Sequence, residues 1–192
     1  MTIAYTALTI ETEPAIEPVT LNEVKAQLKV TDNKQNEPIS NLITTVRRHA
    51  EKLLGRALIT QTWTVFFADW PDGDCFEIPR PPLQTISSIK YKDVDGDQTT
   101  WSTDYYIDDI DSDPGLVTLG YEKSWPSSAL YPSNPIEIEF IAGYGLTVAT
   151  VPEDIRTMIK IGIERMFIRP TDSYDKLLRD IWSDFLWNNR IF

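Results

Sequence analysis

Histidine and cysteine, two residue types that often act as catalytic base and nucleophile, are scarce in this chain. His49 is the only histidine and Cys75 the only cysteine. A hydrolytic triad needs a nucleophile, a base and an orienting group, and no serine or cysteine motif accompanies His49. We interpret His49 as a partly buried or solvated helix residue and Cys75 as a small packing residue. A single cysteine also excludes an intrachain disulfide and a thiolate metal cage.

Two acidic segments resemble calcium-binding loops. They read DVDGDQ at residues 93–98 and DDIDSDPG at residues 108–115. An EF-hand loop has glycine at its sixth position and glutamate at its twelfth, and neither segment supplies both. Asp and Gly are also the residues that tight turns prefer, so we interpret both segments as turns. The chain contains no phosphate-binding glycine loop either, and we expect no catalytic residues, no cofactor and no metal.

Two helices are predicted before residue 55. Thr20 and Glu23 fit a capping box at the start of a short helix that ends near Val30. A second helix begins at Pro38 with apolar residues at positions i, i+3, i+4 and i+7, and Gly55 supplies the positive φ that closes it. Polar residues of this helix are predicted on its outer face: Asn41, Arg47, Arg48, Glu51 and Lys52.

After Gly55 the apolar period changes from that of a helix to two, which is typical of strands. Turn-forming segments rich in Pro, Asp and Gly separate short β-branched and aromatic runs. Five to seven strands are predicted, with candidates at residues 59–65, 76–78, 86–91, 99–101, 105–107, 116–119 and 136–141. Short strands at this spacing favour an antiparallel meander, sandwich or small barrel.

The helical period returns after Gly143-Tyr144-Gly145. One helix is predicted from Pro152 to a point before Pro170, and a last one from about Tyr174 to Trp187. We therefore predict an α+β fold, a helical bundle of two N-terminal and two C-terminal helices with an inserted antiparallel β domain. The expected parts are an extended N-terminal arm at 1–17, the helical bundle module at 18–57 and 146–192, and the inserted domain at 58–145.

Charge and hydropathy narrow the classes of partner. The chain carries 18 Lys and Arg against 29 Asp and Glu, a formal net charge of −11. Such a surface repels phosphate backbones, which disfavours binding to nucleic acid irrespective of its sequence. No apolar run is long enough for a membrane helix and the first residues show no export signal, so we expect a protein made in the cytoplasm, without a membrane partner.

The last segment, RDIWSDFLWNNRIF, carries more apolar residues than one stripe of a helix can hide in a small bundle. Trp and Arg are the types most enriched in binding hot spots, so the segment is either a partner surface or a helix docked on its own bundle.

Five separated motifs resemble the head-tail connector, or adaptor, proteins of long-tailed bacteriophages, in the branch that has a β insertion between helices. They are PVTLNEVKAQLKV (18–30), AEKLLGRALITQTW (50–63), IPRPPLQTISSIKYKDVDG (78–96), FIAGYG (140–145) and VPEDIRTMIKIGIERMF (151–167). Their common order over about residues 18–167 is more specific than any one motif.

The resemblance implies a structural virion protein of the neck, at the head-tail junction. Such proteins form a ring, commonly dodecameric, under the portal protein. They extend the DNA channel, through which DNA passes without specific binding, and provide the docking surface for tail or tail-completion proteins. On this basis we expect portal or partner contacts in the terminal segment, at Trp182, Phe185, Leu186, Trp187, Arg190, Ile191 and Phe192.

An alternative of another class is a carbohydrate-binding or other non-catalytic interaction module. In that case the β region would present Trp63, Trp70, Trp101 and Trp125 as aromatic platforms.

Overall fold

The structure, a computed structural model, describes residues 4–168 of the 192-residue chain. Its contacts divide the chain into two compact units. The β unit comprises Met1–Pro14 and Thr60–Gly143, and the helical unit comprises Ala15–Ile59 and Tyr144–Phe192. The chain therefore crosses from one unit to the other after Pro14, after Ile59 and after Gly143.

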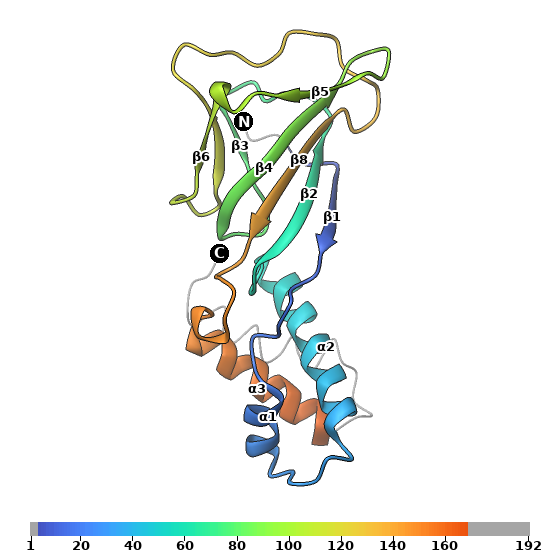
Figure 1. The fold of residues 1–192 in the computed structure, drawn as a ribbon, viewed down its shortest axis with the longest axis vertical. Helices are drawn as coiled ribbons and strands as arrows, with labels where there is room; N and C mark the ends of the chain where they lie inside the picture. Colours follow the sequence, from blue (N-terminus) through green and yellow to red (C-terminus); the bar gives the residue numbers. More distant parts are fainter. Residues whose placement is uncertain (1–3, 169–192) are drawn as a thin grey trace. The chain divides into compact units, whose positions relative to one another are not determined.

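The larger sheet of the β unit has five antiparallel strands in the order β1-β2-β8-β4-β5 (Figure 1). These are β1 (Ala7–Thr12), β2 (Gln61–Phe67), β8 (Ile136–Ala142), β4 (Leu83–Lys92) and β5 (Gln98–Trp101). Strand β8 lies at the centre, and its residues alternate between buried and half-buried along the whole strand. That period of two places one face of β8 in the core.

A second sheet has three antiparallel strands in the order β3-β7-β6. They are β3 (Cys75–Glu77), β7 (Leu116–Leu119) and β6 (Tyr106–Asp109), and the 3-10 turn η1 (Thr103–Tyr105) precedes β6. Phe76 and Val117, which face each other across β3 and β7, are both fully buried. The two sheets together give the β unit its own hydrophobic core.

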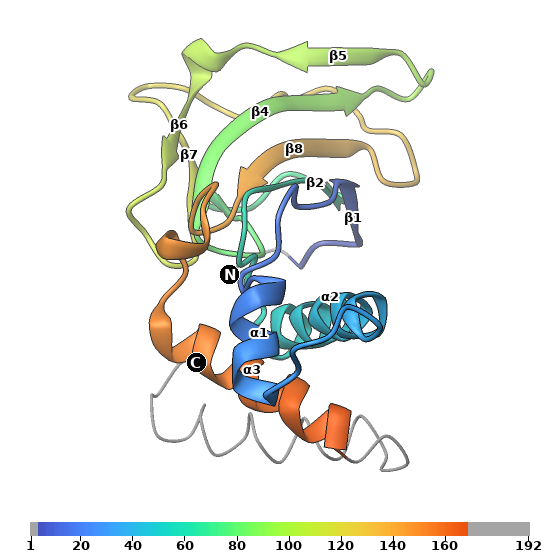
Figure 2. The same ribbon diagram turned by 60° about the horizontal axis from the view of Figure 1, so that its bottom comes forward.

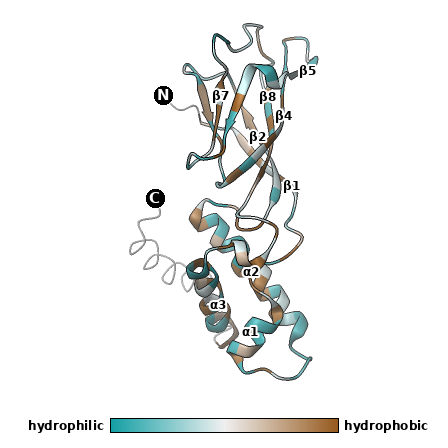
Figure 3. Cartoon of the chain, turned by 60° about the vertical axis from the view of Figure 1, so that its left-hand side comes forward, coloured by the Kyte–Doolittle hydropathy of each residue, from teal (hydrophilic) through white to brown (hydrophobic). Residues whose placement is uncertain are grey.

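The helical unit contains α1 (Leu21–Leu28), α2 (Asn36–Leu54), α3 (Glu153–Ile168) and the 3-10 turn η2 (Val148–Thr150). Each of the three α-helices packs against the other two (Figure 2). Figure 3 shows both apolar and polar stretches on these helices, as expected where one face is buried. The core between them is built largely from β-branched residues, among them Ile39, Ile43, Val46, Ile155 and Ile159.

The predicted helix ends are confirmed at two positions. The Thr20 hydroxyl accepts a hydrogen bond from the Glu23 N–H at 3.2 Å, and the Glu23 carboxylate accepts one from the Thr20 N–H at 2.7 Å. Gly55 ends α2 in the left-handed conformation, with φ +66. Such residues are strong signals of helix ends, because they allow backbone groups that the end of a helix leaves unpaired to form hydrogen bonds.

Gly55→Val is expected to destabilise the helical unit by about 1–2 kcal/mol, because a β-branched residue resists positive φ. An added Cβ would meet no atom within 4 Å, so the cost is backbone strain rather than a clash. Denaturant unfolding measures this change, and Gly73→Val in a β-unit loop, where φ is not positive, is the control. An unchanged midpoint for Gly55→Val would contradict the assignment of the cap.

The α+β class is confirmed, and each of the seven candidate strands is present, with ends shifted by a few residues. The arm expected at residues 1–17 is in part an eighth strand, because Ala7–Thr12 pairs with β2. Ile59, predicted to begin a strand, instead lies in the core of the helical unit. The helix predicted at 174–187 lies outside the described residues.

Candidate interaction surface

The contact residues predicted in the terminal segment all lie outside the described residues. They are Trp182, Phe185, Leu186, Trp187, Arg190, Ile191 and Phe192. Their role in contacting a partner stays a prediction, and the surface of residues 4–168 has to be read from its own contacts.

The two acidic segments form turns, as predicted. A carboxylate oxygen of Asp93 accepts hydrogen bonds from the N–H groups of Asp95 and Asp97, both at 3.0 Å. In the second segment the Ser112 hydroxyl donates to the Asp109 carboxylate at 2.6 Å, and this bond lowers the pKa of Asp109. Within residues 4–168, no group of three or more His, Cys, Asp or Glu side chains could hold a metal ion.

Three of the four tryptophans in the alternative hypothesis pack against one another instead of forming an open platform. Trp70 stacks on Trp125 with ring centroids 5.3 Å apart, and Trp101 lies 5.6 Å from Trp70 and 5.1 Å from Trp125. Phe76 closes the cluster at 5.1 Å from Trp125. Aromatic pairs at these distances stabilise a core, so the packing argues against a carbohydrate platform.

The fourth tryptophan, Trp63 on β2, is covered by a cation. The Arg80 guanidinium lies 5.2 Å from the centroid of the Trp63 ring. Arginine over an aromatic face is a favourable cation–π contact, and it occupies one of the two faces on which a sugar ring could stack. That face of Trp63 is therefore not a free platform.

Arg47 and Glu51 were predicted on the outer face of α2, and that prediction is wrong. Arg47 is only 2% exposed and Glu51 only 6%. Arg47 donates to Glu17 at 2.8 Å and to Glu51 at 2.7 Å, while the other oxygen of Glu51 accepts from the Leu58 N–H at 3.1 Å. Burial alone would lower the pKa of Arg47, but the charges of Glu51 and Glu17 raise it above its usual value.

This buried pair ties three parts of the helical unit together. Glu17 belongs to the segment before α1, Arg47 and Glu51 to α2, and Leu58 to the chain that leaves α2. Buried charges are tolerated only when they are paired and hydrogen-bonded, and here both conditions are met. The network therefore fixes the course of the chain on either side of α1 and α2.

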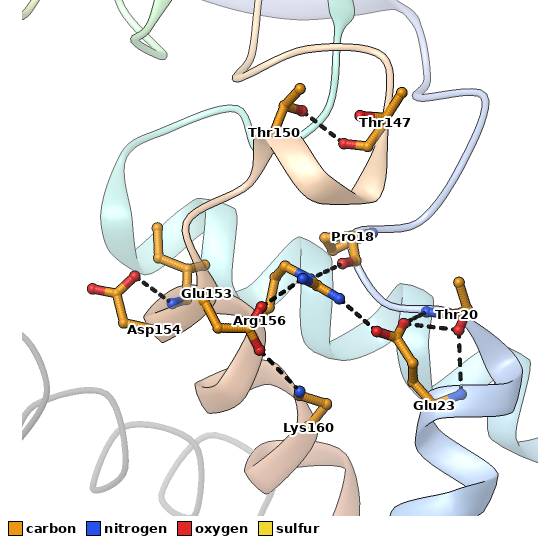
Figure 4. A network of polar contacts seen from close by, with 10 residues as sticks. Pro18, Thr20, Glu23, Thr147, Thr150, Glu153, Asp154, Arg156 and Lys160 are labelled. Carbon is orange, nitrogen blue, oxygen red and sulfur yellow. Dashed lines mark hydrogen bonds and ion pairs between the residues drawn. The ribbon is translucent and has the colours of Figure 1, made fainter.

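A second ionic network joins α1 to α3 (Figure 4). Arg156 donates to the Pro18 carbonyl at 3.2 Å and pairs with Glu23 and Glu153, both at 2.5 Å. Lys160 pairs with the other oxygen of Glu153 at 3.3 Å. Burial alone would raise the pKa of Glu23, but its hydrogen bonds from Thr20 and the charge of Arg156 lower it.

Glu23→Gln is expected to destabilise the helical unit near neutral pH by at most about 1 kcal/mol, since the ion pair is partly exposed. The lowered pKa means that the stabilisation is present above the ordinary value of 4.5 and is lost as pH falls through the folded-state pKa. Denaturant unfolding at several pH values should therefore show wild type and variant converging below pH 4.5. Glu37→Gln, on the exposed start of α2, is the control, and a constant difference down to low pH would contradict the linkage.

Charge is distributed very unevenly between the two units. The β unit contains 17 acidic residues and 4 basic ones, a net −13, whereas the helical unit contains 12 acidic and 14 basic residues, a net +2. The acidic character of the chain therefore belongs to the β unit alone. The electrostatic field of a net charge of −13 attracts positively charged partners to the β unit and repels negatively charged ones.

Several large apolar side chains of the described residues face solvent. In the β unit the most exposed is Tyr121, and in the helical unit the most exposed is Leu146, at 74%. Both lie in loops. Within residues 4–168 no helix is long and apolar enough to cross a membrane.

Comparison with known proteins gives one family and several solved structures. The family model described as phage gp6-like head-tail connector protein matches residues 18–110, which confirms the resemblance seen in the motifs. No curated protein matches the chain.

A chain from the neck of an empty GTA particle, computed with C6 symmetry, is 16% identical and superimposes with a TM-score of 0.75 over 92% of this chain and 95% of that one. A chain from the virion of a native gene transfer agent particle is also 16% identical, with a TM-score of 0.73 over 91% and 94% of the two chains. A chain from the neck of a native GTA particle, computed with C12 symmetry, is 18% identical, with a TM-score of 0.62 over 90% and 94%. At these identities the matches indicate a common fold.

Proposed function

We propose that this chain, which matches the gp6-like head-tail connector family over residues 18–110, is a structural connector in the neck of a phage-like particle. The observation that carries the proposal is the likeness in fold to chains from GTA necks over almost the whole of both chains. The role is architectural and needs no catalysis. It places the protein at the junction of head and tail.

The symmetry of the similar neck structures supports assembly into a ring. Those necks were computed with six-fold and twelve-fold symmetry, so we propose a closed ring of identical copies held together by heterologous contacts. In a heterologous contact, one face of a copy meets a different face of the next copy. The ring closes when a whole number of the rotations between neighbouring copies makes a full turn. We propose a dodecamer.

The charge of the β unit suits a channel for DNA. A wall that carries net negative charge repels the phosphate backbone and lets DNA pass, whereas a basic wall would hold it by releasing counterions. The β unit, at net −13, is the part of the chain that can supply such a wall. We propose that DNA moves through the ring without specific binding.

Two further partners belong to the proposal, the portal protein on one side of the ring and a tail or tail-completion protein on the other. The terminal segment, with Trp182, Trp187 and Phe192, offers the aromatic anchors that hot spots favour. We propose that it contacts the portal.

Deleting residues 180–192 is expected to leave a folded protein that no longer binds the portal protein of its particle. Retention on immobilised portal measures the binding, and the melting temperature reports folding. Tyr121→Ala, which removes the most exposed apolar side chain of the described residues, is the control and should bind like wild type. Undiminished retention after the deletion would contradict the contact, and loss of the fold would show that the segment is core.

A further inference from the structure

An open groove of about 330 Å³ lies on the helical unit. Ile16, Val19 and Leu21, from the start of α1 and the segment before it, form one side, and Ile43 of α2 and Val148 of η2 contribute apolar surface. Its volume is at the small end of the range of about 300–1,000 Å³ that binding pockets span. The groove can thus take one or two apolar side chains.

The polar side chains that line the groove are already hydrogen-bonded within the protein. The Thr44 hydroxyl donates to Glu17 at 2.8 Å, Glu17 also accepts from Arg47, and the Thr20 hydroxyl donates to Glu23 at 2.7 Å. A polar ligand would have to break these bonds or leave its own groups unpaired, which is costly. The groove therefore favours an apolar side chain over a polar small molecule.

The same unit presents such a side chain. Leu146 is 74% exposed and does not line the groove, although Val148, two residues later, does. Its loop is closely packed, since a Cβ at Gly145 would lie 2.8 Å from the Thr150 side chain, and the Thr150 hydroxyl donates to the Thr147 carbonyl at 2.6 Å. A loop backbone held in this way loses little conformational freedom when its apolar side chain binds a partner.

Charge indicates that a second copy of this chain fits the groove. In a closed ring the equivalent parts of neighbouring copies lie side by side, so the β units, at −13 each, repel one another. The helical units, at +2 each, carry almost no such penalty. Attraction between neighbouring copies therefore has to come mainly from the helical unit. This unit has two different apolar surfaces, the groove and Leu146, and a heterologous contact requires two different surfaces.

We infer that Leu146 of one copy inserts into the apolar groove of the next copy and that this contact holds the ring together laterally. The inference rests on the proposed ring and adds which unit makes its contacts and through which residues. In this inference the β units of neighbouring copies do not attract one another.

Two substitutions at exposed positions disrupt this contact, one at the groove and one at the inserted side chain. Ser40→Trp places a large side chain at an exposed position that lines the groove, and Leu146→Ser removes the inserted residue. Asn41→Trp, on an exposed neighbouring position of α2, and Ile107→Ser, on the exposed face of β6, are the matched controls. Native mass spectrometry over a concentration series measures assembly.

Each of the first two variants is expected to raise the concentration needed for half-assembly at least about tenfold, since it loses the burial of one leucine, while the controls behave like wild type. An equimolar mixture of the two should form heterodimers, because the intact Leu146 of Ser40→Trp fits the intact groove of Leu146→Ser. Rings of both variants at wild-type concentrations would overturn the inference and leave the ring itself standing. A wild-type chain that stays monomeric at every concentration would overturn the contact between Leu146 and the groove of the next copy. Binding of that chain to the portal protein would still support the connector role.

Discussion

Arg47→Ala is expected to lower the free energy of unfolding of the helical unit by about 3–5 kcal/mol, because removing one member of a buried ion pair leaves its partner uncompensated. Glu51, 6% exposed, would keep only its bond from the Leu58 N–H among the contacts described above, and Glu17 would lose its guanidinium. Urea unfolding followed by the circular dichroism of the helices measures the loss.

Arg48→Ala is the matched control, since Arg48 is the next residue of α2 and is exposed. A surface substitution of this kind usually changes stability by no more than about 0.5 kcal/mol. Equal effects of Arg47→Ala and Arg48→Ala would show that the buried network does not stabilise the unit.

Phe140→Ala is expected to destabilise the β unit by about 3–5 kcal/mol, since truncating a buried aromatic residue loses its burial and leaves a cavity. Phe140 is fully buried on β8 and pairs in register with Trp63 of β2 and Ile86 of β4. The loss therefore falls at the centre of the five-stranded sheet. Unfolding followed by tryptophan fluorescence measures it, because four of the six tryptophans, Trp63, Trp70, Trp101 and Trp125, belong to the β unit.

Ile141→Ala is the control for the other face of β8, where the side chain is half-buried. Its effect should be clearly smaller, since less apolar surface returns to water. A Phe140→Ala variant within about 1 kcal/mol of wild type would mean that the site collapses around the smaller side chain.

Much of the fold was predictable because it is encoded locally. The capping box of Thr20 and Glu23 and the left-handed Gly55 are each specified by a few neighbouring residues, and both occur in the structure. The seven candidate strands follow from a period of two between turn residues, which is also a local signal. Their pairing order is not local, and the sequence pattern did not provide it.

The errors arose where distant contacts override local polarity. A charged residue on a helix is predicted at the surface, but Glu17, thirty residues earlier in the chain, gives Arg47 a partner and allows its burial. Strand β1 was interpreted as part of an extended arm, because its partner β2 lies fifty or more residues later and nothing near β1 in the chain indicates the pairing. Neither contact leaves a periodic trace in the sequence.

The candidate surfaces were predictable to different degrees. The resemblance in the motifs agrees with the family model of gp6-like head-tail connector proteins, which matches residues 18–110. The groove and the exposure of Leu146 depend on how the segment before α1, α2 and η2 come together, so composition and spacing did not indicate them. The partner role of the terminal segment stays a prediction.

The most direct test of the connector role is the mass of the purified protein in solution, measured by mass photometry over a concentration series at moderate salt. The account predicts a closed species near twelve copies of the 22.0 kDa chain, with few intermediates because an open ring leaves one contact unmade and the two faces at its ends uncovered. A chain that remains monomeric, or that grows into assemblies of no fixed size, would contradict a ring built by this protein's own contacts.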